Sequence, residues 1–456
     1  MLGITIFPEY IQSEGPEALL DRLLEKLPVT AVSTSPYVME ECPAEQGGER
    51  EPPADGDKGL ARLLERPLWG KSEVWVSATP SFEPNLDLYQ GLRYQPQETS
   101  DLTRREGPVI DRFIEACRER SIEVYLQVQS AIPPGYRVQF GGPTKEDMPR
   151  LPDGSIPTRK LDKNGSIASE EILAYGEALI KDLSARYPTI DGIRIDWPEY
   201  PPYFLETVFL DFGAPARSFA EDLGIDFESL QRQMLAVYKH LTEELTDQDL
   251  QTYIDSPDSF FERWSGCTEW LDYKSTLVSN LLRRFKNAIG EDKALFPSSF
   301  PPPWNRLSGF NFKQASEIVD AISCKYYTMH WPMMLRNYAD SITEKNHGLN
   351  KALLAECLAK GFDAYSPIPA SSDDIDYPQP EESHPVDLES LANKQRWVDS
   401  QVGDTPVWAL GHAYGPVEDV KQRAKAVLEA SQDRLWLNRY AYMSDEKLEG
   451  LATIFK

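Results

Sequence analysis

Short apolar runs rich in β-branched residues alternate along the chain with segments of helical spacing. Alternation of this kind is typical of βα units whose strands form a parallel sheet. A closed (β/α)8 barrel needs eight strands, and the chain offers that number, so the pattern predicts an α/β fold of the TIM-barrel type. The predicted strands are residues 3–7, 29–35, 122–128, 192–196, 294–298, 321–327, 407–411 and 435–439.

Amphipathic segments occupy the intervals between several of these strands. In 169–186, for example, Ile172, Leu179, Ile180 and Leu183 recur at the spacing of one helix face. Helices in these positions are what a barrel needs on its outer surface. The predicted helices are residues 16–26, 108–120, 169–186, 277–289, 417–430 and 445–454.

Four stretches are too long for simple connections, so we predict a barrel with long loop and helical insertions. They span roughly 38–107, 131–166, 203–275 and 362–404; the third has a helical pattern, and 74–78 within the first resembles an extra strand. Long loops are usually functional or disordered, and we expect 38–107, 131–166 and 362–404 to form lids and walls over the barrel mouth. Without an internal repeat or a linker, residues 1–456 are interpreted as one catalytic barrel domain.

Composition and charge narrow the class of ligand. The chain has 47 basic and 73 acidic residues, a net charge of −26, which argues against a nucleic-acid partner. The same charge disfavours polyanionic substrates, unless a local basic pocket overrides the overall field. The 10 Trp and 21 Tyr residues suit stacking on sugar rings, although an aromatic core would give the same composition.

Features of targeting and cysteine chemistry lead to an expected cytoplasmic location. The N-terminus lacks the charged and apolar regions of a signal peptide, and no run approaches the roughly 18 apolar residues of a membrane helix, so we expect no membrane contact. The 5 Cys residues are scattered, which favours free thiols in a reducing compartment. The oligomeric state remains open at this stage.

The active site of a TIM barrel lies at the carboxyl ends of its strands, so residues there are candidates. Many are aromatic or polar, as expected where sugar rings stack on aromatic faces and hydroxyls meet polar groups. The sequence therefore predicts a carbohydrate substrate, and it lacks HExxH or other metal motifs, so we expect no metal and no cofactor. The candidate binding residues are Glu9, Tyr10, Tyr37, Gln129, Trp197, Tyr200, Trp304, Lys325, Tyr327, His330, Trp331, His412, Tyr414 and Asn438.

The fourth predicted strand carries the candidate catalytic residues. Arg194 and Asp196 point to the same side of this strand, so Arg194 could hold Asp196 ionised as a nucleophile or a stabilising carboxylate. Glu199 follows a stiff apolar Trp-Pro pair, which would raise its pKa and suit it to acid/base duty. The plainer alternative is a structural Arg194–Asp196 ion pair with Glu199 in a solvated loop.

Residues 191–196 (DGIRID) resemble the fourth-strand motif of the α-amylase clan of glycoside hydrolases, in which Arg-x-Asp supplies the nucleophile. The resemblance implies that Asp196 is the nucleophile and Arg194 its partner. The chain departs from the clan at two places. The acid/base Glu that ends the clan's fifth strand is replaced by FPSS at 296–299, and the seventh-strand acid by GHA at 411–413.

A closer resemblance is to the little-characterised "hypothetical glycosyl hydrolase" TIM-barrel families. It rests on residues 191–203 (DGIRIDWPEYPPY), 303–310 (PWNRLSGF) and 325–334 (KYYTMHWPMM), and on their order and spacing over most of the chain. This resemblance implies a barrel glycosidase and brings little mechanism with it.

We therefore expect a glycoside hydrolase that cleaves an oligosaccharide or glycoconjugate fragment with Asp196, Glu199 and Arg194. One alternative is a non-catalytic carbohydrate-binding barrel, because the fifth- and seventh-strand carboxylates of the amylase clan are missing. Another is a Schiff-base lyase or aldolase that uses Lys325, since class I aldolase barrels use a sixth-strand lysine. A Lys325 paired with Asp196 or Glu199 is the simpler interpretation of that residue.

Overall fold

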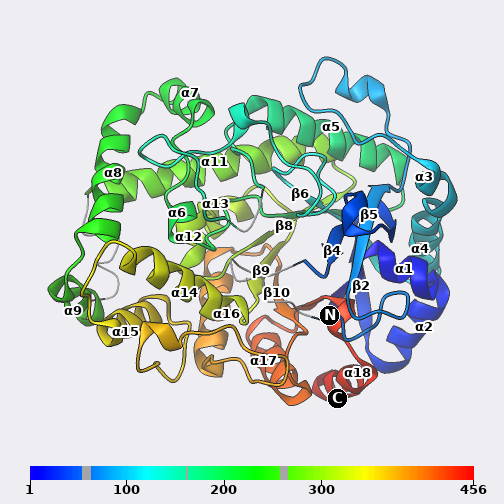
Figure 1. Cartoon of the computed structure of the whole chain (residues 1–456). Helices are drawn as coiled ribbons and strands as arrows, with labels where there is room; N and C mark the ends of the chain where they lie inside the picture. Colours follow the sequence, from blue (N-terminus) through cyan, green and yellow to red (C-terminus); the bar gives the residue numbers. More distant parts are fainter. Residues whose placement is uncertain (54–62, 161–162, 257–264, 456) are drawn as a thin grey trace.

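Eight parallel strands form a closed barrel in the computed structural model, which describes residues 1–53, 63–160, 163–256 and 265–455. Neighbouring strands follow chain order, and the last strand pairs with the first to close the ring (Figure 1). The predicted (β/α)8 TIM-barrel fold is confirmed, and each predicted strand overlaps an observed one. The barrel strands are β1 (Leu2–Thr5), β2 (Val29–Thr34), β6 (Glu123–Gln129), β7 (Gly192–Asp196), β8 (Ala294–Ser299), β9 (Ile322–Tyr326), β10 (Val407–His412) and β11 (Leu435–Asn438).

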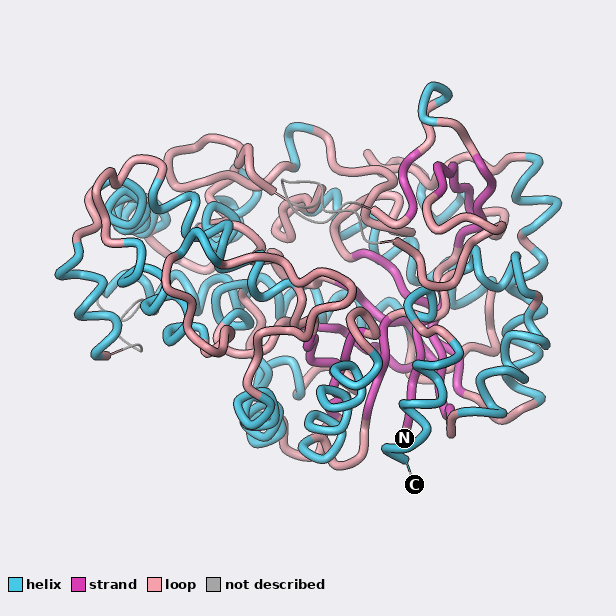
Figure 2. Tube along the Cα trace, turned by 60° about the horizontal axis from the view of Figure 1, so that its bottom comes forward, coloured by secondary structure: helices cyan, strands magenta, loops and turns pink. Residues whose placement is uncertain are grey.

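Helices surround this barrel on all sides (Figures 1 and 2). Two of them, residues 16–26 (α2) and 417–430 (α17), begin and end where the periodicity predicts. The helices are α1 (Pro8–Glu14), α2 (Pro16–Lys26), α3 (Asp101–Glu106), α4 (Pro108–Glu119), α5 (Glu170–Arg186), α6 (Leu205–Val208), α7 (Ala214–Asp222), α8 (Phe227–Glu243), α9 (Asp247–Asp255), α11 (Ser265–Ile289), α12 (Trp304–Ser308), α13 (Phe312–Ser316), α14 (His330–Thr343), α15 (Lys351–Phe362), α16 (Leu388–Gln401), α17 (Val417–Ala430) and α18 (Asp445–Ala452).

Helix α5 illustrates why these segments are helical and how they pack. Its N-cap residue Ser169 accepts a hydrogen bond from the Ile172 backbone, which satisfies one of the free amides of the first turn. A Cβ atom at Gly176 would lie 2.5 Å from Cζ of Phe285 on α11, so the missing side chain lets these two helices approach closely. No helix in the described part of the chain is long and apolar enough to cross a membrane.

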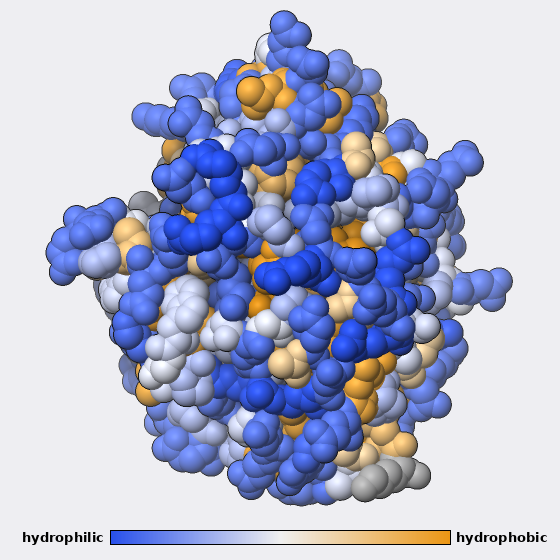
Figure 3. Space-filling view, turned by 90° about the vertical axis from the view of Figure 1, so that its right-hand side faces the viewer, coloured by the Kyte–Doolittle hydropathy of each residue, from blue (hydrophilic) through white to orange (hydrophobic). Residues whose placement is uncertain are grey.

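The insertions carry additional structure. The first contains a small antiparallel sheet in the order β3-β5-β4, formed by β3 (Tyr37–Glu41), β5 (Val74–Pro80) and β4 (Glu49–Glu51). Strand β5 includes the residues 74–78 that the pattern marks as an extra strand. Helices α6 to α9 occupy much of 203–275, and α16 belongs to 362–404. The face that Figure 3 presents is mainly hydrophilic, with small separate apolar patches.

Side chains from alternate strands fill the barrel interior in layers, as is usual for this fold. Arg194 of β7 donates hydrogen bonds to Ser323 of β9 (3.0 Å) and Ser33 of β2 (3.4 Å). Its guanidinium carbon lies 3.9 Å from the ring centroid of Trp436 on β11. We call Ser33, Arg194, Ser323 and Trp436 the lower layer. Gly3 makes room for it, because a Cβ atom there would lie 2.1 Å from the Trp436 ring.

A buried group of charges fastens two insertions to the barrel mouth, and we call it the mouth cluster. Glu51 accepts hydrogen bonds from Arg137 (2.5 Å) and from Arg439. Arg137 also donates to Glu9 (2.9 Å) and to the hydroxyl of Tyr37 (2.7 Å). Burial alone would raise the pKa of Glu51, but the two guanidiniums hold this pKa below its usual value. Each buried carboxylate therefore has a charged partner, which a buried charge requires.

We predict that Glu51→Ala lowers the free energy of unfolding by about 3–5 kcal/mol, because it removes the carboxylate that the buried guanidiniums of Arg137 and Arg439 share and leaves only Arg137 with another, Glu9. Urea unfolding at neutral pH measures this loss. The control is Glu73→Ala, which removes an exposed carboxylate (43% exposed) from an ion pair with Arg50. Such a surface pair contributes at most about 1 kcal/mol. Equally small losses in both variants would contradict a stabilising role of the mouth cluster.

Candidate active site

A cavity of about 530 Å³ lies at the carboxyl ends of the barrel strands. Its lining includes residues at or just beyond the ends of every barrel strand other than β8, which is where a TIM barrel holds its active site. The structure brings seven of the 17 predicted site residues together on this surface. They are Gln129, Asp196, Trp197, Tyr327, His330, His412 and Asn438.

Two insertions supply the remaining walls of the cavity, and sequence reasoning missed their individual residues. The lengths of 38–107 and 131–166 pointed to walls around the mouth, but no local pattern marked which side chains would face inward. Tyr203, at the start of the third insertion, also lines the cavity. The wall residues from the first two insertions are Glu49, Pro53, Tyr136, Arg137, Val138, Gln139, Thr158, Lys160 and Lys163.

The upper layer of the barrel interior forms the floor of the cavity. It consists of Ser35, Asp196, Lys325 and Asn438, which follow the lower-layer residues by two positions in β7, β9 and β11 and just beyond β2; Ser35, Asp196 and Asn438 line the cavity, and Lys325 lies just beneath its surface. Residues two apart on a strand face the same side and are separated by about 6.6 Å along it. Asp196 and Lys325 therefore meet at one height, and Arg194 lies one layer deeper.

Lys325 is the ion-pair partner of Asp196, in keeping with the simpler interpretation of this lysine, whereas the pattern of the fourth strand suggested Arg194. Lys325 Nζ lies 2.5 Å from Asp196 Oδ1, and the hydroxyl of Ser298 donates to the same oxygen at 2.9 Å. Burial alone would raise the pKa of Asp196, but Lys325 and Ser298, with a smaller contribution from Arg194, hold it below its usual value. The Asp196 side chain is 19% exposed, so this ionised carboxylate remains accessible from the cavity.

Glu199 is wholly buried and lies outside the cavity lining. The chain turns at Trp197, whose φ of 51° is in the left-handed region, and Glu199 then accepts a hydrogen bond from the Phe300 backbone at 3.3 Å. Burial raises the pKa of Glu199 to about 8, which outweighs the opposing effect of Lys325. At neutral pH, Asp196 is therefore ionised and Glu199 protonated, although only Asp196 faces the cavity.

Aromatic rings with polar edges form the wall beside Asp196. The ring centroids of Trp197 and Tyr203 are 5.9 Å apart, and those of Tyr203 and His330 are 5.5 Å apart. Tyr327 packs edge-on against His412 at 5.1 Å. Flat apolar faces next to imidazole and hydroxyl groups suit a ligand that is apolar on its faces and polar at its rim.

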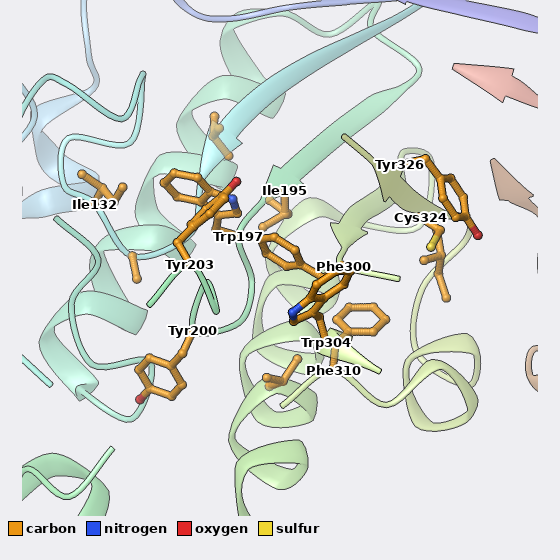
Figure 4. Close-up of a cluster of buried hydrophobic side chains, with 14 of the residues drawn as sticks. Ile132, Ile195, Trp197, Tyr200, Tyr203, Phe300, Trp304, Phe310, Cys324 and Tyr326 are labelled. Atoms are coloured by element: carbon orange, nitrogen blue, oxygen red, sulfur yellow. The ribbon is translucent and has the colours of Figure 1, made fainter. Parts of the chain in front are cut away.

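Two predicted sugar platforms, Trp304 and Trp331, lie in the core instead of the cavity. Trp304 stacks on Phe362 at 5.2 Å and contacts Trp331 at 5.4 Å. Figure 4 shows Trp304 close to Phe310, among the buried side chains next to β8 and β9. Both tryptophans are in helices that follow their strands, α12 and α14, and the inward faces of these helices pack against neighbouring elements.

Three predicted tyrosines are likewise structural. The hydroxyl of Tyr10 donates to the Arg66 carbonyl at 2.7 Å, and that of Tyr414 to the Pro378 carbonyl at 3.0 Å. The Tyr200 hydroxyl donates to Asp211 at 3.1 Å, and Figure 4 shows its ring pointing away from Trp197 and Tyr203.

The other predicted contact residues have roles beneath the surface of the cavity. Glu9 and Tyr37 belong to the mouth cluster, and Lys325 supports Asp196 from the upper layer. Within the described residues, no group of three or more His, Cys, Asp or Glu side chains could hold a metal ion.

No family model and no curated protein sequence matches the chain. Solved structures with a similar fold include the PgaB (BpsB) glycoside hydrolase domain from Bordetella bronchiseptica, with a TM-score of 0.52, 10% identity, and coverage of 99% of this chain and 98% of that domain. The β-amylase catalytic domain from Paenibacillus polymyxa has a TM-score of 0.50, 9% identity, and coverage of 100% and 97%.

The β-galactosidase from the psychrophilic Marinomonas ef1 is a third such structure, with a TM-score of 0.51 and 10% identity. The alignment covers 100% of this chain and 59% of the β-galactosidase. At these identities, the similarity shows a shared barrel fold. The resemblance of 191–196 to the α-amylase clan stays a prediction.

We predict that Glu199→Gln changes the pH dependence of stability. The folded pKa of about 8 exceeds the unfolded value of about 4.3, so the stability contributed by protonated Glu199 is complete below pH 4.3 and is lost as the pH rises through 8. The unfolding free energy of the parent should therefore fall relative to the variant between about pH 5 and 8, by on the order of a few kcal/mol.

Urea unfolding at several pH values measures this difference. The matched control is Glu389→Gln, which changes a glutamate that is 71% exposed and should leave the profile unaltered. A constant offset between the parent and Glu199→Gln across this pH range would show that Glu199 is ionised in the folded protein.

Proposed function

We propose that this chain is a glycoside hydrolase that cleaves an oligosaccharide or glycoconjugate fragment in the cavity at the barrel mouth. The observation that carries the proposal is Asp196, an ionised and partly exposed carboxylate held by Lys325 and Ser298 in a cavity with aromatic and amide walls. Similar barrels include the PgaB glycoside hydrolase domain and a β-amylase catalytic domain, which supports a glycosidase.

Asp196 acts in this proposal as the nucleophile or as the carboxylate that stabilises an oxocarbenium-like transition state. Lys325 keeps it ionised, and Arg194 adds a weaker electrostatic contribution from the layer below. Trp197 and Tyr327 stack on sugar rings. The hydroxyls of the sugar bind to Gln129, His330, His412 and Asn438, which all line the cavity.

Glu199 is the proposed acid/base, because it is a protonated carboxyl group whose pKa depends on the charges of Asp196 and Lys325. General acid catalysis needs the donor within hydrogen-bond reach of the leaving oxygen, directly or through one water. Since Glu199 is covered in the free protein, substrate binding has to open a path between its carboxyl group and the cavity.

We predict that Asp196→Asn lowers kcat by about 10³-fold or more on any glycan that the parent cleaves, because an amide is neither a nucleophile nor a charge stabiliser. Release of reducing ends from a broad panel of oligosaccharides and aryl glycosides measures this loss. Binding of the same glycan should persist in the variant. A parent protein that binds a glycan and cleaves no member of the panel would overturn the hydrolase proposal.

A second prediction tests the role of Glu199 through the leaving group. If Glu199 protonates the leaving oxygen, Glu199→Gln should lower kcat by about 10²–10⁴-fold for alkyl or sugar leaving groups. The loss should be small for a dinitrophenyl glycoside, whose leaving group needs no proton. Glu206→Gln, which changes a buried glutamate away from the cavity, is the matched control. Equal losses with both leaving groups would exclude Glu199 as the acid.

A carbohydrate-binding barrel without catalysis is the second candidate function. The specific observation in its favour is that Glu199 is buried outside the cavity, while β8 and β10 contribute Ser298 and His412 to the site. The Schiff-base alternative has less support, because Lys325 is only 3% exposed and its amine is engaged by Asp196.

A further inference from the structure

The carboxylate of Asp196 keeps one of its two oxygens available to a ligand. Lys325 Nζ, the Ser298 hydroxyl and the Trp197 backbone nitrogen all contact Oδ1, at 2.5, 2.9 and 3.1 Å. No residue in the described part of the chain donates a hydrogen bond to Oδ2. Because the side chain lines the cavity and is 19% exposed, Oδ2 is the oxygen left to meet the sugar.

Gln129 of β6 lies beside Asp196 on the neighbouring strand. The two residues are register partners in the barrel, and both line the cavity. Neighbouring strands are about 4.8 Å apart, so the two side chains enter the cavity side by side. The Ser130 backbone donates to the Asp196 carbonyl at 3.2 Å, and the Gln129 backbone donates to the Gly135 carbonyl at 2.8 Å. These bonds fix the spacing of the two side chains before any ligand arrives.

The side-chain amide of Gln129 makes no hydrogen bond with the described residues. The residue is 7% exposed, and its Oε1 is buried without a partner. Buried side-chain amides are usually hydrogen-bonded, so an unused one next to an accessible carboxylate indicates a ligand site. On the other side of Asp196, Ser298 of β8 already donates to the carboxylate. Gln129 is therefore the neighbour of Asp196 that still has hydrogen bonds to offer.

The chemistry of a sugar ring determines which of its atoms Gln129 can bind. The anomeric carbon has two ring neighbours, the ring oxygen and C2. The ring oxygen carries no hydrogen and gains positive charge in an oxocarbenium-like transition state, so it does not benefit from an amide N–H. A hydroxyl on C2 can accept from the Gln129 amide and donate to the Asp196 carboxylate at the same time.

Other parts of the cavity lining suit an uncharged ring. Gln127 and Asn438 also line the cavity, and their side-chain amides likewise make no hydrogen bond with the described residues. The guanidiniums of Arg137 and Arg439 are already paired with Glu51. A neutral sugar would therefore meet amides that match its hydroxyls, whereas an acidic group would find these two arginines occupied.

We propose that Gln129 is a specificity-determining residue that binds the 2-hydroxyl of the sugar whose anomeric carbon meets Asp196, and that the substrate is a glycoside of a neutral sugar with a free 2-hydroxyl. Hydrogen bonds to this hydroxyl strengthen in the transition state, so the contact acts mainly on kcat. The nitrogen of a 2-acylamino group donates but does not accept, so it cannot bridge the two side chains in this way. This inference rests on the proposed function and names its substrate class.

Hydrolysis of paired aryl glycosides by the full chain tests the proposal. The probes are the 4-nitrophenyl α- and β-glycosides of D-glucose, D-galactose, D-mannose, D-xylose and L-fucose, their 2-deoxy counterparts, and 4-nitrophenyl N-acetyl-β-D-glucosaminide. After subtraction of spontaneous hydrolysis, the parent should cleave at least one 2-hydroxy glycoside with a kcat about 10²-fold above that of its 2-deoxy counterpart. Gln129→Leu should lose a similar factor on the 2-hydroxy glycoside and almost nothing on the 2-deoxy one.

Three further variants separate this role from a structural one. Gln129→Met is a second replacement of similar length and should behave like Gln129→Leu. Asn438→Ala removes a cavity amide from β11, four strands from β7 around the ring, and should lose equally on the 2-hydroxy and 2-deoxy glycosides. Gln422→Leu makes the matched change at an exposed position on α17 and should leave both rates unaltered.

Equal losses on the two glycosides in both Gln129 variants would assign this residue a structural role and overturn the inference. A parent that cleaves both members of each pair equally, or that prefers the N-acetylglucosaminide, would overturn it as well. If the parent cleaves none of these aryl glycosides but releases reducing ends from other members of the oligosaccharide panel, the inference is lost and the hydrolase proposal stands. Inactivity in both assays would remove the hydrolase proposal and this inference with it.

Discussion

Side chains from alternate strands stack in layers inside the barrel. The height of each layer determines which charged side chains lie next to the cavity. The lower layer buries Arg194 between serine hydroxyls and the Trp436 ring, and burial lowers the pKa of this guanidinium to about 10. The upper layer brings Asp196 and Lys325 together at the cavity floor. The barrel thus separates its two interior cations by height, and the upper one, Lys325, supports the reactive carboxylate from just beneath the cavity surface.

The mouth cluster positions the two insertions that form the walls of the cavity. Glu51 belongs to the first insertion and Arg137 to the second, and neither charge can be buried without the other at acceptable cost. The two insertions are therefore held to the barrel mouth as a unit. Arg137 and Arg439 belong to both the cluster and the lining, so the contacts that shape the cavity also occupy these two guanidiniums.

The sequence predicted the barrel well because every barrel strand is a short apolar run that alternates with segments of helical spacing. The strand ends placed Gln129, Asp196 and Asn438 at the cavity, since side-chain direction alternates reliably along a strand. This alternation gives no guidance beyond the last strand residue, because Trp197 and Tyr327 line the cavity there, whereas Trp304 lies in a helix and packs in the core. Contacts such as Glu51–Arg137, which join residues 86 positions apart, leave no local trace in the sequence.

Glu199 has the protonation state of a general acid, although its carboxyl group lies outside the cavity lining. Burial raises the pKa of Glu199, the negative charge of Asp196 adds to this rise, and the positive charge of Lys325 opposes it. If Asp196 forms a covalent bond to the sugar, its charge is lost and the pKa of Glu199 falls. Glu199 would then change from a proton donor to a base for the attacking water, as a retaining mechanism requires. The protonation states of the two carboxyl groups are thus coupled, although a turn at Trp197 removes one of them from the cavity wall.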